Sequence, residues 1–280
     1  MRHAATPLRH SRVANALAGT RFGQAITVLG RVGSTSDVLL ARARANAPDG
    51  AVIAADTQTG GRGRRGTTWI SPARQGLYFS CLLRRVPPMD QLRLLAPCAG
   101  LAVVSVLRAS GVPALLKWPN DVLAHGGKLA GILVDVCTEG TRTHAVIGIG
   151  VNLRLDALTK LPEAALPAAA LAAGTNAQRS DGLWLREELL CALLHSLEAE
   201  LAALERGEFE RLRANYRSVD ALRGHNIVAL CGENTVRGRV LECDPVHGLL
   251  LHTADQSQQR LDPARTHITW VEGLSATARL

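Results

Sequence analysis

Residues 57–66 form the stretch of this sequence that is best suited to bind an anion. The segment reads Thr-Gln-Thr-Gly-Gly-Arg-Gly-Arg-Arg-Gly and contains four glycines and three arginines. Its glycines disfavour helix and strand, whereas a glycine-rich loop can direct backbone N–H groups at an anion while guanidinium groups bind its oxygens. No acidic residue lies between Thr57 and Asp90, so we expect these arginines to lack competing carboxylates nearby. The plain alternative is a solvated, arginine-rich surface loop.

Lysine is scarce in this otherwise cation-rich chain. Of the 32 cationic residues, only Lys117, Lys128 and Lys160 are lysines. Lysine is a compact ammonium charge and arginine a planar fork, so lysines kept in such a chain suggest that an ammonium is required there. Lys117 and Lys128 begin or end neighbouring predicted strands, which favours ligand-facing positions. Lys160 lies in an Ala/Pro-rich connection, and we interpret it as a solvated surface residue.

Pro119 stops a predicted strand and brings polar residues to its end. Because the residue before a proline is held extended, the strand at 115–117 should end in a turn that presents Lys117, Asn120 and Asp121 together. A simple Pro-Asn-Asp turn explains the same residues without any ligand, and that alternative stays open.

Hydroxyl residues precede a predicted helix, and glycines end a predicted strand. Ser34 and Asp37 have the spacing of a helix capping box, so capping alone explains Ser34 and Thr35. Hydroxyl groups at a helix start can also bind the polar part of a ligand, and the two roles are compatible. The strand end at 148–152 reads Gly-Ile-Gly-Val-Asn, in which the glycines let a flat ligand approach the backbone.

The remaining pattern predicts the elements that position these residues. Apolar runs and helical periodicity predict strands at 26–29, 50–55, 76–83, 115–117, 128–136 and 144–152, and helices at 12–18, 37–45, 94–109, 181–204 and 209–216. Ser180 and Asp181 are the expected cap of the fourth of these helices, and Trp184 belongs to its apolar stripe. Short β-runs at 227–231, 235–242, 248–253 and 267–271 predict a small antiparallel barrel.

Composition narrows the class of protein. With 280 residues and 47% apolar residues, the chain can bury a large core. Its six cysteines form no Cys-x-x-Cys pair and are interpreted as core residues in a reducing compartment. The formal net charge of +8 is local, because residues 1–85 contain thirteen arginines and three acidic residues. We find neither a signal-peptide pattern nor a membrane-length apolar stretch free of charge, and we expect a soluble, cytoplasmic protein.

Five motifs, taken in order, closely resemble those of the biotin–protein ligases, which biotinylate a carboxylase carrier domain. They are Gly33-Ser34-Thr35, residues 58–66 with Trp69, residues 117–121, residues 127–133, and residues 148–152. The resemblance implies an α+β fold with a central mixed β-sheet catalytic domain, class II aminoacyl-tRNA synthetase-like, with helices packed on it and a small C-terminal SH3-like β-barrel. The implied organisation is a basic N-terminal extension at 1–25, a catalytic biotin- and ATP-binding domain at 26–220, the SH3-like domain at 221–272 and a tail at 273–280.

The resemblance also implies an activity. Biotin and MgATP would give biotinyl-5′-AMP and diphosphate, and biotin would then pass to a specific lysine of the biotin carboxyl carrier protein domain of acetyl-CoA carboxylase. The sequence resembles the monofunctional class without a DNA-binding domain, which implies neither DNA nor membrane as a partner and either a monomer or a homodimer.

Residue roles follow from the same resemblance. Biotin contacts are implied for Ser34, Thr35, Ser36, Gln58, Gly61, Arg62, Gly63, Arg64, Lys128 and Gly131. Nucleotide contacts are implied for Arg62, Arg64, Trp69, Lys117, Asn120, Lys128 and Asn152, and catalytic roles for Arg64, Lys117, Asp121 and Lys128. Two departures are visible: Ser36 replaces the family's usual Asn, and residues 265–269 depart from the commoner Gly-Glu-Val ending.

Two other functions remain as alternatives. Lipoate or octanoate ligation uses a related fold, but the chain has no Arg-Arg-x-x-Gly-Gly-Gly loop and no obvious reactive cysteine. A nucleic-acid-binding regulator would explain the charge, yet no helix-turn-helix candidate or aromatic platform is present.

Overall fold

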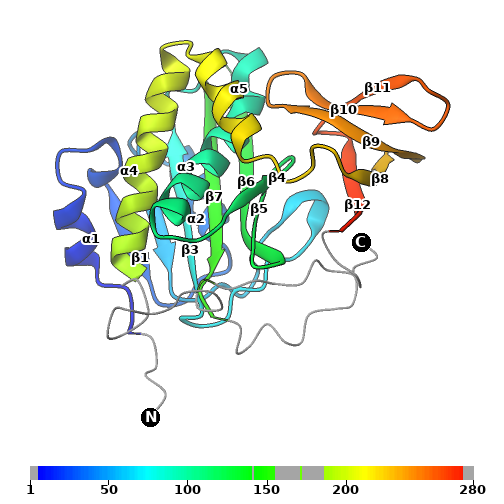
Figure 1. Cartoon of the computed structure of the whole chain (residues 1–280). Coiled ribbons are helices and arrows are strands. Elements are labelled where there is room, and N and C mark those ends of the chain that lie inside the picture. The colour runs from blue at the N-terminus through cyan, green and yellow to red at the C-terminus, as the bar shows by residue number, and fades with distance from the viewer. Residues whose placement is uncertain (1–5, 141, 155–170, 172–185, 274–280) are drawn as a thin grey trace.

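The computed structural model of the chain describes residues 6–140, 142–154, 171 and 186–273. Its larger sheet contains seven strands in the order β1-β2-β3-β7-β6-β5-β4 (Figure 1). β1 and β2 run parallel, and the other neighbouring pairs are antiparallel, so the predicted mixed sheet is confirmed. The strands are β1 Ile26–Leu29, β2 Val52–Ala55, β3 Gly76–Leu83, β4 Leu115–Lys117, β5 Asp121–Ala124, β6 Gly127–Glu139 and β7 Arg142–Asn152.

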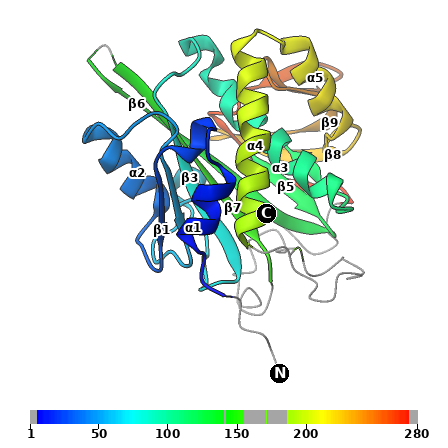
Figure 2. The same ribbon diagram turned by 90° about the vertical axis from the view of Figure 1, so that its left-hand side faces the viewer.

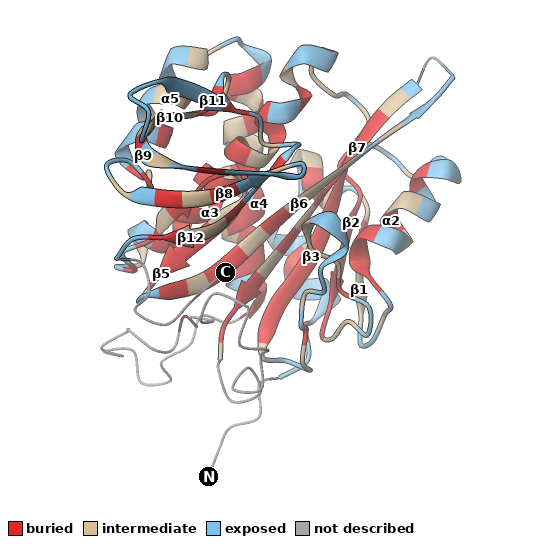
Figure 3. Cartoon of the chain, turned by 90° about the vertical axis from the view of Figure 1, so that its right-hand side faces the viewer, coloured by how far each residue is buried: buried red, intermediate tan, exposed pale blue. Residues whose placement is uncertain are grey.

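Helices cover both faces of this sheet. α1 (His10–Ala16), α3 (Leu95–Ala109) and α4 (Arg186–Glu205) pack in the main hydrophobic core on one face (Figure 2). α2 (Thr35–Arg44) packs on the other face through a smaller apolar cluster, and α5 (Phe209–Ser218) leads toward the second sheet. With both faces covered, β2 and β3 are buried throughout, which explains their nearly continuous apolar sequence (Figure 3).

The face that carries α2 also carries the glycines and hydroxyls singled out above. Leu82 of β3 and Val146 of β7 pack against Leu39 of α2. Because side chains alternate between faces with a period of two, Ser80 and Gly148 belong to this same face. The sheet therefore presents a polar, glycine-lined surface beside the first turn of α2.

The N-terminal segment contributes to the core. We predicted residues 1–25 to be a basic extension, but within them α1 and the 3-10 turn η1 (Arg21–Gly23) are packed on the protein. Val13, Leu17 and Phe22 are completely buried there. The apolar residues of this segment are hard to recognise in the sequence, because arginines stand directly before two of the buried ones, Val13 and Phe22.

The last part of the described chain forms a second sheet of five antiparallel strands in the order β11-β10-β9-β8-β12. Its strands are β8 Asn226–Cys231, β9 Asn234–Asp244, β10 Gly248–Thr253, β11 Gln258–Leu261 and β12 Thr266–Val271. The four predicted β-runs are confirmed, whereas β11 was missed because its polar Gln-Gln-Arg sequence has no strand signature. The SH3-like assignment stays a prediction.

The predicted helix cap at Ser180 and Asp181, with Trp184 and Lys160, lies outside the described residues. Four of the six cysteines are buried as predicted, whereas Cys137 and Cys231 are partly exposed. Among the described residues, one helical stretch, Met89–Ala109, has the length and composition to cross a membrane, and two-thirds of its apolar window (67%) is buried inside the protein, as in the core helix of a soluble domain.

Candidate active site

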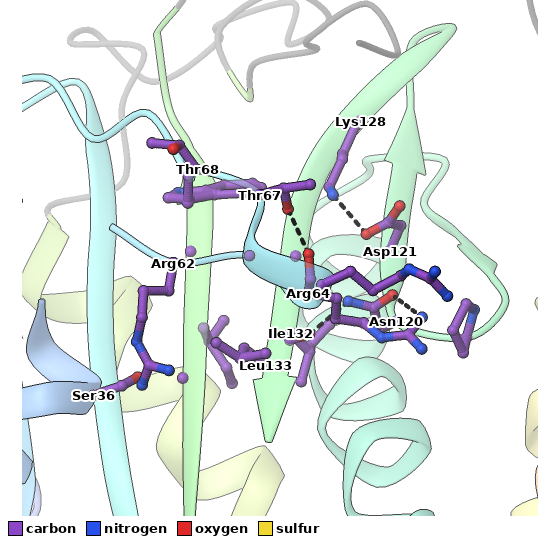
Figure 4. A pocket seen from close by; sticks show the side chains of 18 of the residues that line it. Ser36, Arg62, Arg64, Thr67, Thr68, Asn120, Asp121, Lys128, Ile132 and Leu133 are labelled. Carbon is purple, nitrogen blue, oxygen red and sulfur yellow. Dashed lines mark hydrogen bonds and ion pairs between the residues drawn. The ribbon is translucent and has the colours of Figure 1, made fainter. Parts of the chain in front are cut away.

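A cavity of about 410 Å³ opens on the α2 face of the large sheet. Its walls are the first turn of α2, the loop at 58–69, the turn between β4 and β5, parts of β6 and β7, and the edge of the second sheet. Figure 4 shows the loop residues Arg62 and Arg64 with Asp121 and Lys128. A volume of this size matches a site for a small molecule or cofactor. All the predicted site residues line this cavity except Gly61 and Asn152.

Hydroxyl and amide groups gather at the α2 end of the cavity. The side chain of Ser34 caps α2 by accepting a hydrogen bond from Asp37 N, as the capping-box spacing predicted. Gln58 Oε1 accepts from the backbone N–H of Thr35 at 2.8 Å and from its hydroxyl at 3.1 Å. Ser80, which the motifs did not include, bonds to the hydroxyls of both Thr35 and Ser36. This end is therefore built for a neutral polar group.

Cations surround a single carboxylate at the opposite end. Lys128 Nζ lies 2.7 Å from Asp121 Oδ1, and Lys117 Nζ lies 3.9 Å from Asp121 Oδ2. Lys117 is 5% exposed, and it reaches the cavity from the end of β4, next to the cis Trp118–Pro119 peptide. The turn thus presents Lys117, Asn120 and Asp121 together, as Pro119 predicted.

Burial and neighbouring charges shift the pKa values of Asp121 and Lys117. Burial would raise the pKa of Asp121, but Lys128 and Lys117 outweigh that effect and hold its pKa below the ordinary value. Burial lowers the pKa of Lys117, and the positive charges of Lys128 and Arg64 lower it further, against the attraction of Asp121. Asp121 is thus an ionised structural counter-ion and a weak base at neutral pH. The cations exceed it in number, which leaves this end positive and suited to an anion.

Arg64 approaches the same cluster from the glycine-rich loop. It begins the 3-10 turn η2 (Arg64–Gly66), and its guanidinium donates to Asn120 Oδ1 at 3.5 Å and to the Pro263 carbonyl in the connection between β11 and β12. Burial lowers its pKa, with the neighbouring charge of Arg65 acting in the same direction and Asp121 in the opposite one. No side-chain carboxylate among the described residues pairs with Arg64, so its charge is available to a ligand.

Arg62 behaves differently, and here our expectation was wrong. We inferred from the sequence that no acid competes for the loop arginines, but Arg62 Nε lies 2.9 Å from Asp37 Oδ1 and Arg62 Nη2 lies 2.7 Å from Asp135 Oδ2. These carboxylates come from α2 and β6, far away in sequence. Figure 4 shows the Arg62 side chain beside Ser36, away from Arg64 and Lys128. Arg62 therefore fastens the loop to the sheet.

The ion pairs of Arg62 lead to a testable expectation. We expect Arg62→Ala and Asp135→Asn each to raise the hydrogen-exchange rate of residues 60–68 about fivefold, because a partly exposed ion pair contributes about 1 kcal/mol. The double variant should exchange no faster than Arg62→Ala alone, since Arg62→Ala already removes the ion pair with Asp135 together with the one to Asp37. Arg44→Ala is the matched control, because Arg44 also joins α2 to β6, through Glu139, without touching the loop. Additive effects of Arg62→Ala and Asp135→Asn would contradict the fastening role.

Glycines allow the loop to double back on itself. A Cβ atom at Gly61 would lie 2.4 Å from the Trp69 carbonyl oxygen, and one at Gly63 would lie 2.4 Å from Thr67 Oγ1. The two limbs are joined by backbone bonds, with Gly63 N donating to Thr67 O at 2.7 Å. Close approach of the two limbs therefore requires glycine at both positions.

A flat group already occupies the glycine surface of β6 and β7. The Trp69 indole lies on Gly131 and Gly150, where added Cβ atoms would come within 2.9 Å and 2.5 Å of its ring. Lys128 Nζ is 5.2 Å from the ring centroid, a cation–π distance. Asn152, which lies outside the cavity wall, donates through Nδ2 to the Lys128 carbonyl at 3.2 Å and so supports the strand that carries Lys128.

The second sheet supplies wall residues that the motifs did not reveal. Leu230 of β8 and Thr266, His267 and Ile268 of β12 line the cavity. Burial lowers the pKa of His267, and the charges of Lys117, Arg65 and Arg64 lower it further, while Asp121 opposes them. In the sequence, residues 266–268 were marked only because they depart from the Gly-Glu-Val ending that is commoner in the family. Leu230 had no signal, because contacts between distant segments leave no local sequence pattern.

Comparisons with known proteins agree with this geometry. Residues 28–152 match the biotin/lipoate A/B protein ligase family. A biotin–[acetyl-CoA-carboxylase] ligase of Mycobacterium tuberculosis is 36% identical over 85% of this chain and 87% of its own length. The bifunctional ligase/repressor BirA of Escherichia coli is 28% identical over 85% of this chain and 72% of its own. A biotin protein ligase from Aquifex aeolicus, solved in complex with biotin and ATP, superimposes with a TM-score of 0.72 at 26% identity, covering 88% of this chain and 98% of that one. The chain therefore belongs to the biotin/lipoate A/B protein ligase family and is a ligase of the biotin–protein ligase type.

Proposed function

We propose that this protein forms biotinyl-5′-AMP from biotin and MgATP and then transfers biotin to a lysine of a biotin carboxyl carrier domain. The observation that carries the proposal is one cavity with two chemically different ends. Hydroxyl and amide groups of Thr35, Ser36 and Gln58 lie at one end, and Lys117, Lys128 and Arg64 lie at the other. Biotin has matching ends, because its ureido ring is neutral and polar and its valerate ends in a carboxylate.

In this proposal, biotin lies along the α2 face of the sheet. Ser34, Thr35, Ser36 and Gln58 bind the ureido ring. Gly63 and Gly131 act indirectly, because Gly63 lets the loop double back and Gly131 lets the Trp69 indole lie on the sheet beside the ligand. The valerate carboxylate then reaches Lys128. The ATP α-phosphate meets Lys128 and Arg64, with the adenine near Trp69 and the departing diphosphate nearer Lys117 and Asn120. Asn152 acts on the nucleotide end through the Lys128 backbone that it holds.

The first step is attack of the biotin carboxylate on the α-phosphorus, with diphosphate as the leaving group. Negative charge concentrates on the phosphoryl oxygens during this step, so cations fixed in advance stabilise the transition state. Asp121 holds Lys117 and Lys128 in place and stays ionised because of them. Magnesium enters as part of the substrate MgATP, and among the described residues no cluster of three or more His, Cys, Asp or Glu side chains offers a separate metal site.

In the second step the amine of the carrier lysine attacks the acyl carbon of the mixed anhydride, and AMP leaves. Asp121 would orient the incoming ammonium group, and loss of a proton to solvent would free its lone pair. The loop at 58–69 would cover the anhydride and keep water away until the carrier arrives. The name of the Mycobacterium tuberculosis relative supports the carrier domain of acetyl-CoA carboxylase as the protein substrate.

The substrate choice is tested by ligand-dependent melting. We expect biotin to raise the melting temperature of the protein, and MgATP added with biotin to raise it much further because the adenylate accumulates in the site. Lipoate and octanoate should give no shift, since neither carries the N–H donors that the hydroxyl end can bind. A shift with lipoate and none with biotin would favour the alternative ligation.

His267 makes nucleotide binding sensitive to pH. Burial and the charges of Lys117, Arg65 and Arg64 lower its pKa, so bound phosphate, which neutralises those charges, should raise the pKa and cause proton uptake below the ordinary histidine pKa of about 6.5. By linkage, nucleotide binding should tighten as pH falls through that region. Calorimetric titration in two buffers of different ionisation enthalpy measures the uptake, which His267→Gln should reduce by up to about one proton. His252→Gln, on β10, is the control, and equal uptake in wild type and His267→Gln would contradict this role for the imidazole.

A further inference from the structure

At the hydroxyl end of the cavity, two backbone groups determine which side-chain groups donate hydrogen bonds and which accept them. Gln58 Oε1 faces the backbone N–H of Thr35 at 2.8 Å, and that group can only donate. On its other side, Gln58 Nε2 faces Ser71 Oγ at 2.9 Å, and the Ser71 hydroxyl donates its one proton to the Trp69 carbonyl. Ser71 must therefore accept from Gln58. The two backbone groups thus fix which end of the Gln58 amide is oxygen and which is nitrogen.

This polarity extends through three hydroxyls. Thr35 Oγ1 donates its single proton to Gln58 Oε1 at 3.1 Å, so it must accept from Ser80 Oγ at 2.8 Å. Ser80 has then used its own proton, so it must accept from Ser36 Oγ at 3.0 Å. Every hydroxyl proton of the series is used within the protein, which leaves only lone pairs on Ser36 and Thr35 for a ligand.

We propose that Ser80 is a positioning residue that holds Ser36 and Thr35 as obligate acceptors, so that the cavity selects a ligand group with N–H donors. The second N–H of Gln58 and the free proton of Ser34 remain as donors for a carbonyl oxygen. Two acceptors and two donors complement a cyclic urea, which offers two N–H groups and one carbonyl. The proposal rests on the proposed function and deepens it, because the dithiolane of lipoate has no N–H to offer.

Within the part of the chain that the structure describes, the Ser80 hydroxyl bonds only to Thr35 and Ser36. Ser80 is 0% exposed in the middle of β3, among apolar neighbours, so its proton must go to a buried acceptor. Ser36 can reach it because the adjacent strand position is Gly148, where a Cβ atom would lie 2.7 Å from Ser36 Oγ. The same arrangement explains how Ser36 fills the family's usual Asn position, since a shorter side chain backed by Ser80 presents a fixed acceptor.

The test is the biotin dissociation constant of Ser80→Ala. Without Ser80 the hydroxyls of Ser36 and Thr35 lose their fixed orientation, and we expect biotin to bind about tenfold more weakly. The Michaelis constant for ATP and the rate at saturating biotin should stay near the wild-type values, which a general distortion of the cavity would not allow. Dethiobiotin, which keeps the ureido group, should lose affinity by the same factor. Ser196→Ala is the matched control, because it removes a hydroxyl that bonds only to the Ala102 carbonyl in the helical layer.

A second variant separates positioning from direct contact. Ser36→Ala should weaken biotin binding by a similar factor, and Ser36→Ala combined with Ser80→Ala should add little, because Ser80 acts largely through Ser36. Wild-type biotin affinity in Ser80→Ala, or fully additive losses, would overturn the proposal while leaving biotin ligation intact. Failure of the unmodified protein to bind biotin would instead overturn the proposed function.

Discussion

Replacing Arg64 with alanine is expected to make the enzyme release biotinyl-5′-AMP before a carrier lysine can react with it. Arg64 has no carboxylate partner within the described part of the chain, and Asn120 and the Pro263 carbonyl hold it beside the cations of the cavity. A charge-assisted contact to phosphate contributes about 1.5–3 kcal/mol, so the adenylate should dissociate about ten- to a hundredfold faster. Free adenylate is reactive, and it should then label lysines of bystander proteins that carry no carrier domain.

Two measurements detect the release of biotinyl-5′-AMP by Arg64→Ala. One is the fraction of labelled adenylate that stays with the protein after rapid gel filtration, and the other is biotin incorporated into an added bystander protein. Arg85→Ala removes an exposed arginine that lies outside the cavity wall and is the control. Retention of the adenylate by Arg64→Ala as complete as in the control would rule out phosphate binding by Arg64.

Substituting arginine for Lys128 is expected to slow adenylate formation about a hundred- to a thousandfold, the usual range for losing one preorganised charge contact. The ammonium of Lys128 lies 2.7 Å from Asp121 and 5.2 Å from the Trp69 ring centroid. A guanidinium keeps the charge but is larger and planar, so it cannot follow the reacting oxygen from carboxylate to anhydride in the same space. The fold should persist, because the Lys128 side chain is already 28% exposed.

The control for that substitution is Lys160→Arg. We interpreted Lys160 from the sequence as a solvated lysine, so its replacement should change nothing measurable. Single-turnover formation of the adenylate and the melting temperature should be measured for both variants. Equal, near-native rates would mean that the scarcity of lysine in this chain is compositional and that Lys128 has no special chemical role.

Much of the large sheet could be predicted from the sequence because strands such as β2 and β3 are buried along their whole length. The runs that became β3 and α3 are long and mostly apolar, and Pro119 marked the turn before β5. β11 was missed because it lies at the edge of the second sheet, where exposed Gln258 and Gln259 need no apolar pattern. The core position of α1 was missed because its flanking arginines obscured Val13.

Only the cavity residues that belong to short contiguous motifs could be predicted from the sequence. Those motifs supplied the cations and most of the hydroxyls, but not the groups that position them. Asp135 and Ser80 are polar residues inside apolar strands, which is the one signal that could have identified them. The partners themselves could not be predicted, because Arg62 meets Asp135 across 73 residues of chain. The contribution of β12 likewise depends on how two sheets pack, which no local pattern encodes.

The central claim is that the two ends of one cavity bring the biotin carboxylate and the α-phosphate of ATP together. Exchange of labelled diphosphate into ATP measures that step directly, without any carrier protein. We predict exchange that requires both biotin and Mg²⁺, that lipoate does not support, and that Lys128→Arg suppresses. Exchange that proceeds equally without biotin, or none in a folded protein saturated with both substrates, would contradict the account.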